Sequence, residues 1–373
     1  MSPIRIVLAP NAFKGTLTAE AAAAAMAAGV RDALPSADIL LRPLADGGDG
    51  SLDALVSAGF TRHPVTTRGP TGEPVESSFV IRDRVAVAEL ADSCGLGRLP
   101  AGRLVPMTSN TAGLGDAIRA ALSADVDDVV ICVGGSASTD GGAGMLMALG
   151  AVLRDAHAET VQPGGGSLGS IVDVNLSDID PRLAGVSIIV ATDVTSPLLG
   201  PTGAAAVFGP QKGADAHEVA ELESGLTSWS DALARLTGVD ARTEPGAGAA
   251  GGTAFAAIAA LDAHIISGAQ FIATAIGLAD AIAEADLVIT GEGALDLQST
   301  LGKGTGFVAR LAEERGVPCI AICGRLELDE DQLAQMGITV ATSLNEADAH
   351  DPVASLRSAT ANAMRARAVP SES

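Results

Sequence analysis

The sequence is poor in lysine. Of its 23 basic residues only three are lysines, Lys14, Lys212 and Lys303, and each of them precedes a glycine. A compact lysine ammonium on a flexible stem is not interchangeable with the planar guanidinium of arginine. We therefore expect the three lysines to meet one polyanionic ligand. The alternative is that codon bias thinned lysine at random.

Aromatic residues are also scarce, at 2% of 373 residues, with no tyrosine and one tryptophan, Trp229. The core must then consist of alanine, valine, leucine and isoleucine. A flavodoxin-type electron carrier is disfavoured, because side chains that could sandwich a flavin are nearly absent. The four cysteines show no Cys-x-x-Cys spacing, and three lie in or beside apolar runs, which predicts buried free thiols.

Net positive charge and long hydrophobic runs are missing as well. The formal net charge is −22, which argues against nucleic-acid binding and against docking on anionic lipid. The longest charge-poor segment, 263–279, is interrupted by polar residues, and the N-terminus is unlike a secretory signal. These absences predict a soluble, cytoplasmic protein without nucleic-acid or membrane partners. A homodimer is left open.

Strand and helix patterns alternate at both ends of the chain. Strands are predicted at 4–9, 38–44, 287–290, 317–323 and 338–342, and helices at 18–34, 51–58, 305–315, 329–336 and 353–367. They would form a five-stranded, doubly wound parallel sheet. The region between them alternates apolar and polar residues at 64–68, 75–81 and 85–90, which predicts antiparallel strands. Buried strands are expected at 129–133 and 187–191. Residues 64–286 would thus be an inserted α/β domain, and residues 1–63 plus 287–373 the first domain.

The segment 287–304 combines a short apolar run with glycines and charges. Its strand is predicted to stop at Thr290-Gly291-Glu292-Gly293, where glycines would let the backbone turn sharply and approach a ligand. Asp296 and Lys303 follow on a glycine-rich connection, which suggests binding of phosphate and metal. An ordinary strand–helix turn is the alternative.

Three further loops follow predicted strands. Asp46-Gly-Gly-Asp-Gly50 offers clustered carboxylates suited to Mg²⁺, or a tight turn with an aspartate helix cap. Residues 134–142 could form a nest of backbone amides for an anion, although they do not match the P-loop pattern. Asp193 could accept a proton from a substrate hydroxyl or hold a metal. Acids, lysines, hydroxyls and glycine nests are what phosphoryl transfer requires.

These motifs, in this order, resemble the bacterial type I glycerate kinases along nearly the whole chain. The segments that carry the resemblance are Ala9-Pro-Asn-Ala-Phe-Lys-Gly15, Ala45-Asp-Gly-Gly-Asp-Gly50, Gly134-Gly-Ser-Ala-Ser-Thr-Asp-Gly-Gly142, Asp193-Val-Thr-Ser-Pro-Leu-Leu-Gly200, Phe208-Gly-Pro-Gln-Lys-Gly213, Pro245-Gly-Ala-Gly-Ala-Ala-Gly-Gly252 and Thr290-Gly-Glu-Gly293 with Asp296, Gln298 and Lys303. The resemblance implies ATP-dependent phosphorylation of D-glycerate, typically at the 2-hydroxyl. It also implies a flavodoxin-like domain interrupted by a second α/β domain. Asn11, Asp49 and Ser138-Thr139 depart from the residues common in that family.

Residue chemistry suggests a role for each candidate. Asp193 would be the base or hydroxyl-orienting acid, and Lys14, Lys212 and Lys303 would contact phosphates or the glycerate carboxylate. Asp46 and Asp296 would hold Mg²⁺. The loops would cradle ATP and substrate in a site between the domains, through Asn11, Gly134, Gly135, Ser136, Ser138, Thr195, Gly291, Gly293 and Gln298. Two alternatives stay open: a kinase for a related hydroxy acid, and a non-catalytic glycerate or nucleotide sensor.

Overall fold

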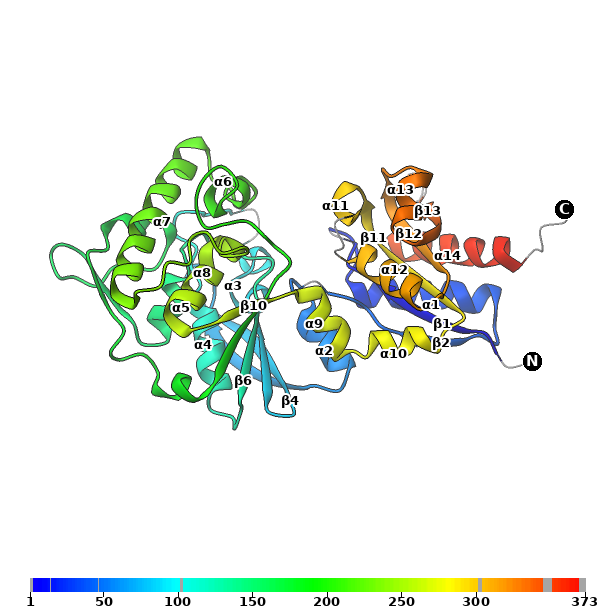
Figure 1. Cartoon of the computed structure of the whole chain (residues 1–373), viewed down its shortest axis with the longest axis horizontal. Helices are drawn as coiled ribbons and strands as arrows, with labels where there is room; N and C mark the ends of the chain where they lie inside the picture. Colours follow the sequence, from blue (N-terminus) through cyan, green and yellow to red (C-terminus); the bar gives the residue numbers. More distant parts are fainter. Residues whose placement is uncertain are drawn as a thin grey trace. The chain divides into compact units, whose positions relative to one another are not determined.

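The chain folds into two compact units, each built on a β-sheet (Figure 1). The structure is a computed structural model that describes residues 3–13, 15–45, 47–100, 103–300, 304–344 and 351–368. Unit 1 comprises Met1–Asp46, Asp53–Ala58 and Ala269–Ser373, and unit 2 comprises Gly47–Leu52 and Gly59–Gly268. Helices accompany the sheet in each unit, so the protein is an α/β protein with two α/β domains.

Unit 1 contains a parallel five-stranded sheet. Its strand order is β13–β12–β11–β1–β2, with β1 at Arg5–Pro10, β2 at Asp38–Leu41, β11 at Leu287–Leu295, β12 at Cys319–Leu326 and β13 at Ile338–Ser343. The five strands predicted from the two ends of the chain are all present. Ile6, Val7 and Leu8 on β1 are fully buried, as expected when helices cover both faces of a parallel sheet.

The helices of unit 1 are α1 (Ala19–Ala33), α2 (Ser51–Ser57, shared with unit 2), α9 (Gly268–Ala275), α10 (Leu278–Ala283), α11 (Leu297–Thr300), α12 (Thr305–Glu314), α13 (Glu330–Gln335) and α14 (Pro352–Ala368). Of these helices, α1, α2, α12, α13 and α14 were predicted, whereas α9, α10 and α11 were not. Thr18 caps α1, because its hydroxyl accepts a hydrogen bond from the Ala21 amide at 3.1 Å. α14 lies beside α1 (Figure 1), so close at Gly29 that a Cβ there would come within 2.3 Å of the Arg357 carbonyl oxygen.

One strand prediction in unit 1 was wrong. β11 does not end at Thr290 but continues through the glycines to Leu295, paired with β12. The reason is steric: a Cβ at Gly291 would lie 1.9 Å from the Ile322 carbonyl oxygen, and one at Gly324 would lie 2.4 Å from that of Gly293. The glycines therefore allow two strands to approach closely, rather than making a turn. A smaller difference is that β2 ends at Leu41, not Leu44.

Unit 2 contains a mixed six-stranded sheet in the order β10–β9–β6–β5–β4–β3. Its strands are β3 (Thr61–Arg68), β4 (Pro74–Arg82), β5 (Val85–Glu89), β6 (Asp128–Cys132), β9 (Ser187–Ala191) and β10 (His264–Ile266). The pairs β3–β4 and β4–β5 are antiparallel, as predicted, whereas β5, β6, β9 and β10 run parallel. The short hairpin β7–β8 (Val152–Arg154 and Asp173–Asn175) and strand β10 were not predicted.

The helices of unit 2 surround a separate apolar core. They are α3 (Leu90–Cys94), α4 (Ala112–Ala121), α5 (Ala143–Ala148), α6 (Ala204–Phe208), α7 (Ala216–Thr237) and α8 (Ala249–Leu261), with short 3-10 helices η1 (Leu96–Arg98), η2 (Gly165–Ser170), η3 (Pro181–Gly185) and η4 (Pro210–Lys212). Trp229 and Phe255 are fully buried among aliphatic side chains. The side chains of Asp215 and Glu218 form a capping box that starts α7.

Candidate active site

Three neighbouring parallel strands of unit 2, β5, β6 and β9, present polar residues at their carboxyl ends. Glu89 is the last residue of β5, residues 134–142 follow β6 closely, and Asp193 follows β9. In α/β sheets, ligands bind outside the carboxyl ends of parallel strands. This edge of the sheet is therefore the candidate site in unit 2.

The loop at 134–142 is held in shape by Asp140, which is fully buried. Its carboxylate accepts hydrogen bonds from the amide (2.9 Å) and hydroxyl (2.8 Å) of Thr111, and from the amides of Gly142 (3.2 Å) and Gly144 (3.1 Å). Burial raises the pKa of Asp140, whereas these hydrogen bonds act to lower it. The loop needs glycine at 135, 141 and 142, where φ is positive.

Lys212 is buried beneath the same loop, with 2% of its surface exposed. Its ammonium donates a hydrogen bond to the Ser136 hydroxyl at 2.8 Å and another to the Ser138 carbonyl oxygen. Burial lowers the pKa of Lys212 to about 7, and the negative charge of Asp140 opposes that shift. The structure thus places Lys212 with Gly134, Gly135, Ser136 and Ser138, and its ammonium is bonded to the oxygens of the loop itself.

Two hydroxyls of this loop, those of Ser138 and Thr139, are buried without a hydrogen-bond partner among the described residues. Ser109, close in sequence to Thr111, carries another such hydroxyl. Buried polar groups in native proteins nearly always have partners, and orphaned groups point to a ligand or water. The loop therefore has hydroxyls that could donate hydrogen bonds to an oxygen of a bound phosphate or substrate.

A second loop packs across the same strand ends. The Gly134 amide donates a hydrogen bond to the Gly47 carbonyl oxygen at 2.9 Å. A Cβ at Gly134 would come within 2.4 Å of the Gly48 Cα, and one at Gly47 within 2.7 Å of the Ala191 carbonyl oxygen. Glycine is thus required for this close approach. Asp46 itself lies outside the described residues.

Asp193 supplies a carboxylate at the end of β9. It is half-buried, and its Oδ1 accepts a hydrogen bond from the Ser267 hydroxyl at 2.7 Å. Ser267 follows β10, the strand next to β9, so two adjacent strand ends orient this side chain. Thr195, predicted to bind the substrate, is exposed two residues further on.

Glu89 was missed by the sequence analysis. Its carboxylate is 3% exposed and accepts hydrogen bonds from the amides of Gly50 (3.2 Å) and Leu52 (3.0 Å). Burial raises its pKa to about 8, and the negative charges of Asp49 and Asp92 add to the shift. Its only sequence signal is an acid at the end of the alternating run Val85-Ala-Val-Ala-Glu89.

Four more predicted residues are described in unit 1. Asn11 follows β1 and Asp296 follows β11, whereas Gly291 and Gly293 lie within β11. The Asn11 amide donates to the Gly291 carbonyl oxygen at 2.8 Å, and a Cβ at Gly304 would come within 2.6 Å of the Asn11 side-chain amide. Asp296 follows β11, and its amide donates to the Ser299 hydroxyl at 3.3 Å. That hydroxyl donates to Glu292, a further acid that the sequence analysis did not select, at 2.8 Å. The rest of the predicted set lies outside what the structure describes: Lys14, Lys303 and the side chain of Gln298.

Comparison with known proteins identifies the family. A profile of the glycerate kinase family matches residues 6–369. The chain belongs to the glycerate kinase family. It is 40% identical to the glycerate 2-kinase of Escherichia coli K12 over 353 residues, covering 92% of each chain. It is also 40% identical to the glycerate kinase of Bacillus subtilis 168 over 345 residues, covering 91% of this chain and 90% of that one.

A solved structure agrees with this assignment. A crystal structure titled "putative glycerate kinase 2 from Salmonella typhimurium LT2" superposes with a TM-score of 0.82 at 36% identity, covering 98% of both chains. The resemblance inferred from the motifs is thus confirmed at the level of the family, and the protein is a glycerate kinase. No helix in the described ranges is both long and apolar enough to cross a membrane.

The residues present fit the ATP that a kinase of this family uses. Positive-φ glycines, two orphaned hydroxyls and a buried ammonium gather at the 134–142 loop, which suits an anionic group. Within the described ranges, no group of three or more histidine, cysteine, aspartate or glutamate side chains is spaced to hold a metal ion. Mg²⁺ needs few protein ligands because it keeps several waters, so one or two carboxylates would be enough.

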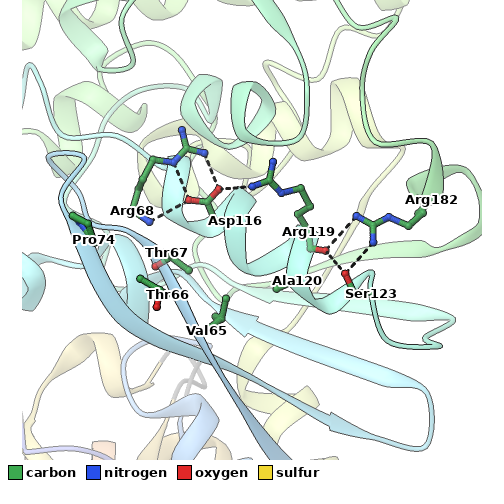
Figure 2. Close-up of a pocket in the computed structure, with 10 residues that line it drawn as sticks. All are labelled: Val65, Thr66, Thr67, Arg68, Pro74, Asp116, Arg119, Ala120, Ser123 and Arg182. Atoms are coloured by element: carbon green, nitrogen blue, oxygen red, sulfur yellow. Dashed lines mark hydrogen bonds and ion pairs between the residues drawn. The ribbon is translucent and has the colours of Figure 1, made fainter.

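The kinase has a groove of about 660 Å³ elsewhere on unit 2 (Figure 2). β3, α4 and η3 line most of it, and three arginines are prominent there. Figure 2 shows that the chain's own groups hold these arginines: the Arg68 guanidinium donates two hydrogen bonds to the Asp116 carboxylate, and Arg182 donates to Ser123. Arg119 is also near Asp116, at 3.5 Å. None of the predicted site residues lines this groove.

The cysteines of the kinase are buried and free, as predicted. Burial raises the pKa of Cys94 to about 11, and those of Cys319 and Cys323 to about 12. A thiol protonated at neutral pH is a poor nucleophile. These cysteines therefore contribute to packing rather than to covalent chemistry.

Proposed function

We propose that this kinase transfers the γ-phosphoryl group of ATP to the 2-hydroxyl of D-glycerate, giving 2-phospho-D-glycerate and ADP. The observation that carries the proposal is the 40% identity to a glycerate 2-kinase over 92% of both chains. In this reaction the substrate oxygen forms a bond to the γ-phosphorus, the bond from that phosphorus to the β–γ bridging oxygen breaks, and the hydroxyl proton is released. The carboxyl edge of β5, β6 and β9 supports the proposal, because it brings an acid, hydroxyls and an ammonium together.

We propose that Asp193 orients the substrate hydroxyl and accepts its proton. The Ser267 hydroxyl orients this carboxylate through its Oδ1 atom, at the strand ends where a substrate would bind. The loop at 134–142, including Gly134, Gly135, Ser136 and Ser138, would bind phosphate oxygens through its amides and hydroxyls. Lys212 lies beneath that loop, where a bound phosphate would favour its charged ammonium form and low dielectric would strengthen their attraction.

The other predicted roles remain part of the proposal. Lys14 and Lys303 would contact phosphates or the glycerate carboxylate, and Thr195 would bind the substrate. In unit 1, Asn11, Gly291, Gly293 and Gln298 would shape the pocket for ATP. Asp46 and Asp296 would hold Mg²⁺, which neutralises charge on the phosphates when bound.

We also propose a finer description of the fold. The parallel order β2–β1–β11–β12–β13 corresponds to the 2-1-3-4-5 order of flavodoxin-like sheets. Unit 1 would thus correspond to the flavodoxin-like, doubly wound domain that the sequence analysis bounded at 1–63 and 287–373, and unit 2 to the inserted domain bounded there at 64–286. We further place the enzyme in the cytoplasm, for which its buried free thiols are suited.

Phosphorus NMR of the reaction product tests the proposed reaction. The purified enzyme is incubated with ATP, Mg²⁺ and D-glycerate, and the product is compared with authentic 2- and 3-phosphoglycerate. We expect the 2-phospho ester, and little turnover with L-glycerate or longer sugar acids. A 3-phospho ester would overturn the regiochemistry, preference for another acid would overturn the substrate, and no ADP with any acid would overturn the kinase proposal.

A further inference from the structure

The carboxyl group of Glu89 holds the loop that joins β2 to α2. One oxygen, Oε1, accepts from the Gly50 amide at 3.2 Å, and the other, Oε2, accepts from the Leu52 amide at 3.0 Å. Gly50 and Leu52 flank Ser51, the first residue of α2. Each oxygen of Glu89 is therefore committed to one amide at the start of this helix.

A glutamate at this position is energetically costly. The residue is 3% exposed, and no arginine or lysine within the described ranges forms an ion pair with it. Asp49 and Asp92 are close enough for their charges to act on it unfavourably. A buried carboxyl without a cation destabilises the fold, so its presence points to a role that packing alone does not explain.

Only a carboxyl group suits both amides, because each of its two oxygens can accept a hydrogen bond. Glutamine has the same shape but offers one acceptor oxygen, and its NH₂ group would face the other backbone N–H, donor against donor. Leucine would leave both amides without a partner. The two hydrogen bonds therefore need the glutamate itself.

The loop that Glu89 holds lies against the candidate phosphate loop. Gly47 accepts from the Gly134 amide at 2.9 Å, and Gly48 lies so close to Gly134 that no Cβ fits between them. Ser51 closes the turn, because its hydroxyl donates to the Gly48 carbonyl oxygen at 2.6 Å. Release of the amides of Gly50 and Leu52 would loosen the segment that carries Asp49 and follows Asp46.

We propose that Glu89 is a positioning residue for phosphoryl transfer, which sets the Gly47-Gly-Asp-Gly50 loop against the 134–142 loop. This inference rests on the proposed function, because the loop matters for rate only if its carboxylates serve the metal-bound nucleotide. Glu89 does not touch substrate. Its effect is transmitted through the backbone of 47–52.

Glu89→Gln is the informative variant, and Asp92→Asn is its matched control. Asp92 lies in the same acidic neighbourhood, but its carboxylate bonds to Ser77, Ser78 and Arg98 rather than to the loop. Hydrogen–deuterium exchange of the ligand-free enzymes is measured first. We expect peptides covering 47–55 to exchange at least tenfold faster in Glu89→Gln than in wild type, and at the wild-type rate in Asp92→Asn.

Steady-state kinetics is measured next, at varied Mg²⁺ and varied glycerate. For Glu89→Gln we expect kcat to fall on the order of 10²-fold, since a misplacement of about 1 Å costs that much. The half-saturating Mg²⁺ concentration should rise several-fold, while KM for glycerate stays within twofold. Asp92→Asn should keep wild-type values.

The outcomes separate the two proposals. Unchanged exchange at 47–55, or wild-type kcat and Mg²⁺ dependence in Glu89→Gln, would overturn the positioning role. An inactive wild-type enzyme would instead overturn the proposed function. The exchange experiment would still test whether the hydrogen bonds of Glu89 stabilise the loop. If Glu89→Gln does not fold, Glu89→Asp replaces it, because the shorter carboxylate cannot reach both amides.

Discussion

At the scale of single residues, the one described lysine, Lys212, differs from the described arginines. Most described arginines form surface ion pairs, such as those of Arg84 with Asp127 and of Arg357 with Asp32. Lys212, by contrast, is buried with its ammonium inside a loop. Exposed pairs contribute little to stability, whereas a buried ammonium has consequences that can be measured.

Lys212 makes stability depend on pH in a defined direction. Its pKa is about 7 in the folded chain and 10.5 ordinarily, so between these values the unfolded chain binds a proton that the folded chain does not. Stability contributed by this residue therefore rises with pH across that window and is constant below it. From pH 7.5 to 8.5 we expect the unfolding free energy of wild type to rise by about 1 kcal/mol relative to Lys212→Met.

Urea unfolding of both proteins at the two pH values measures this difference. Glu89, whose pKa is about 8, acts in the opposite direction, but it is present in both proteins and cancels. The pH range of the experiment also stays below 9.0, the ordinary pKa of a cysteine thiol. Equal pH dependence in the two proteins would contradict the assignment, and Lys212→Gln is the second variant should Lys212→Met not fold.

Asp193 is the residue whose removal should reduce chemistry most. Asp193→Asn keeps the shape and an acceptor for the Ser267 hydroxyl but cannot take up a proton. We expect kcat to fall by about 10²- to 10⁴-fold with little change in KM for glycerate. Ser267→Ala, which removes only the orienting donor, should lose about tenfold or less. A kcat for Asp193→Asn within threefold of wild type would exclude the catalytic role.

The sequence indicated the loops that form the candidate site, but not the residues that hold these loops in place. Asp193 and the 134–142 loop were found because each follows an apolar strand. Glu89 and Asp140 were not selected, because their importance comes from burial and from amides far along the chain, at 50–52 and at 111. A single sequence does not reveal those distant partners.

At the scale of elements, glycines decide how closely segments approach. In β11, Gly291 was taken for a turn residue, yet it lies in a strand because β12 leaves no room for a Cβ. Strand periodicity is readable from sequence, whereas the distance to a neighbouring backbone is not. The predicted strands were therefore mostly correct, whereas the end of β11, at its glycine-rich segment, was not.

The glycine-rich start of α8 provides a test of this argument. Gly251 has φ of +66°, and a Cβ there would lie 2.3 Å from the Ser138 carbonyl oxygen and 2.6 Å from the Thr139 Cα. Gly251→Ala should destabilise the fold by about 2–4 kcal/mol, through backbone strain and displacement of the 134–142 loop. Activity should fall with it.

Gly185→Ala is the control for this variant. Gly185 ends η3, its φ is not positive, and no atom lies within 4 Å of the position that a Cβ would take there. Its substitution should change stability by less than about 0.5 kcal/mol. Thermal unfolding and steady-state activity of both variants decide the matter, and equal effects would refute the steric argument.

At the scale of the whole molecule, the chain has apolar clusters that belong to separate units. One contains Trp229, Phe255 and the aliphatic residues of β5, β6 and β9, all from unit 2. Another contains Ile6, Met26, Ile289 and Leu356, all from unit 1. Burial of apolar surface is the main stabilising term in folding, so each unit has its own source of cooperativity.

Trp229 makes the stability of unit 2 separately observable. It is the only tryptophan of the chain and fully buried, and its indole N–H donates to the Gly141 carbonyl oxygen at 2.9 Å. Its fluorescence therefore reports unit 2 and the candidate phosphate loop, whereas far-ultraviolet circular dichroism reports the helices of both units. In urea we expect the two signals to give different midpoints, because two cores of different size need not unfold together.

ATP at a hundred times its dissociation constant should stabilise the unit that binds it by about 2.7 kcal/mol, and we expect the fluorescence midpoint to move to a higher urea concentration. Coincident midpoints for both probes, with and without ATP, would show that the chain unfolds as one cooperative body.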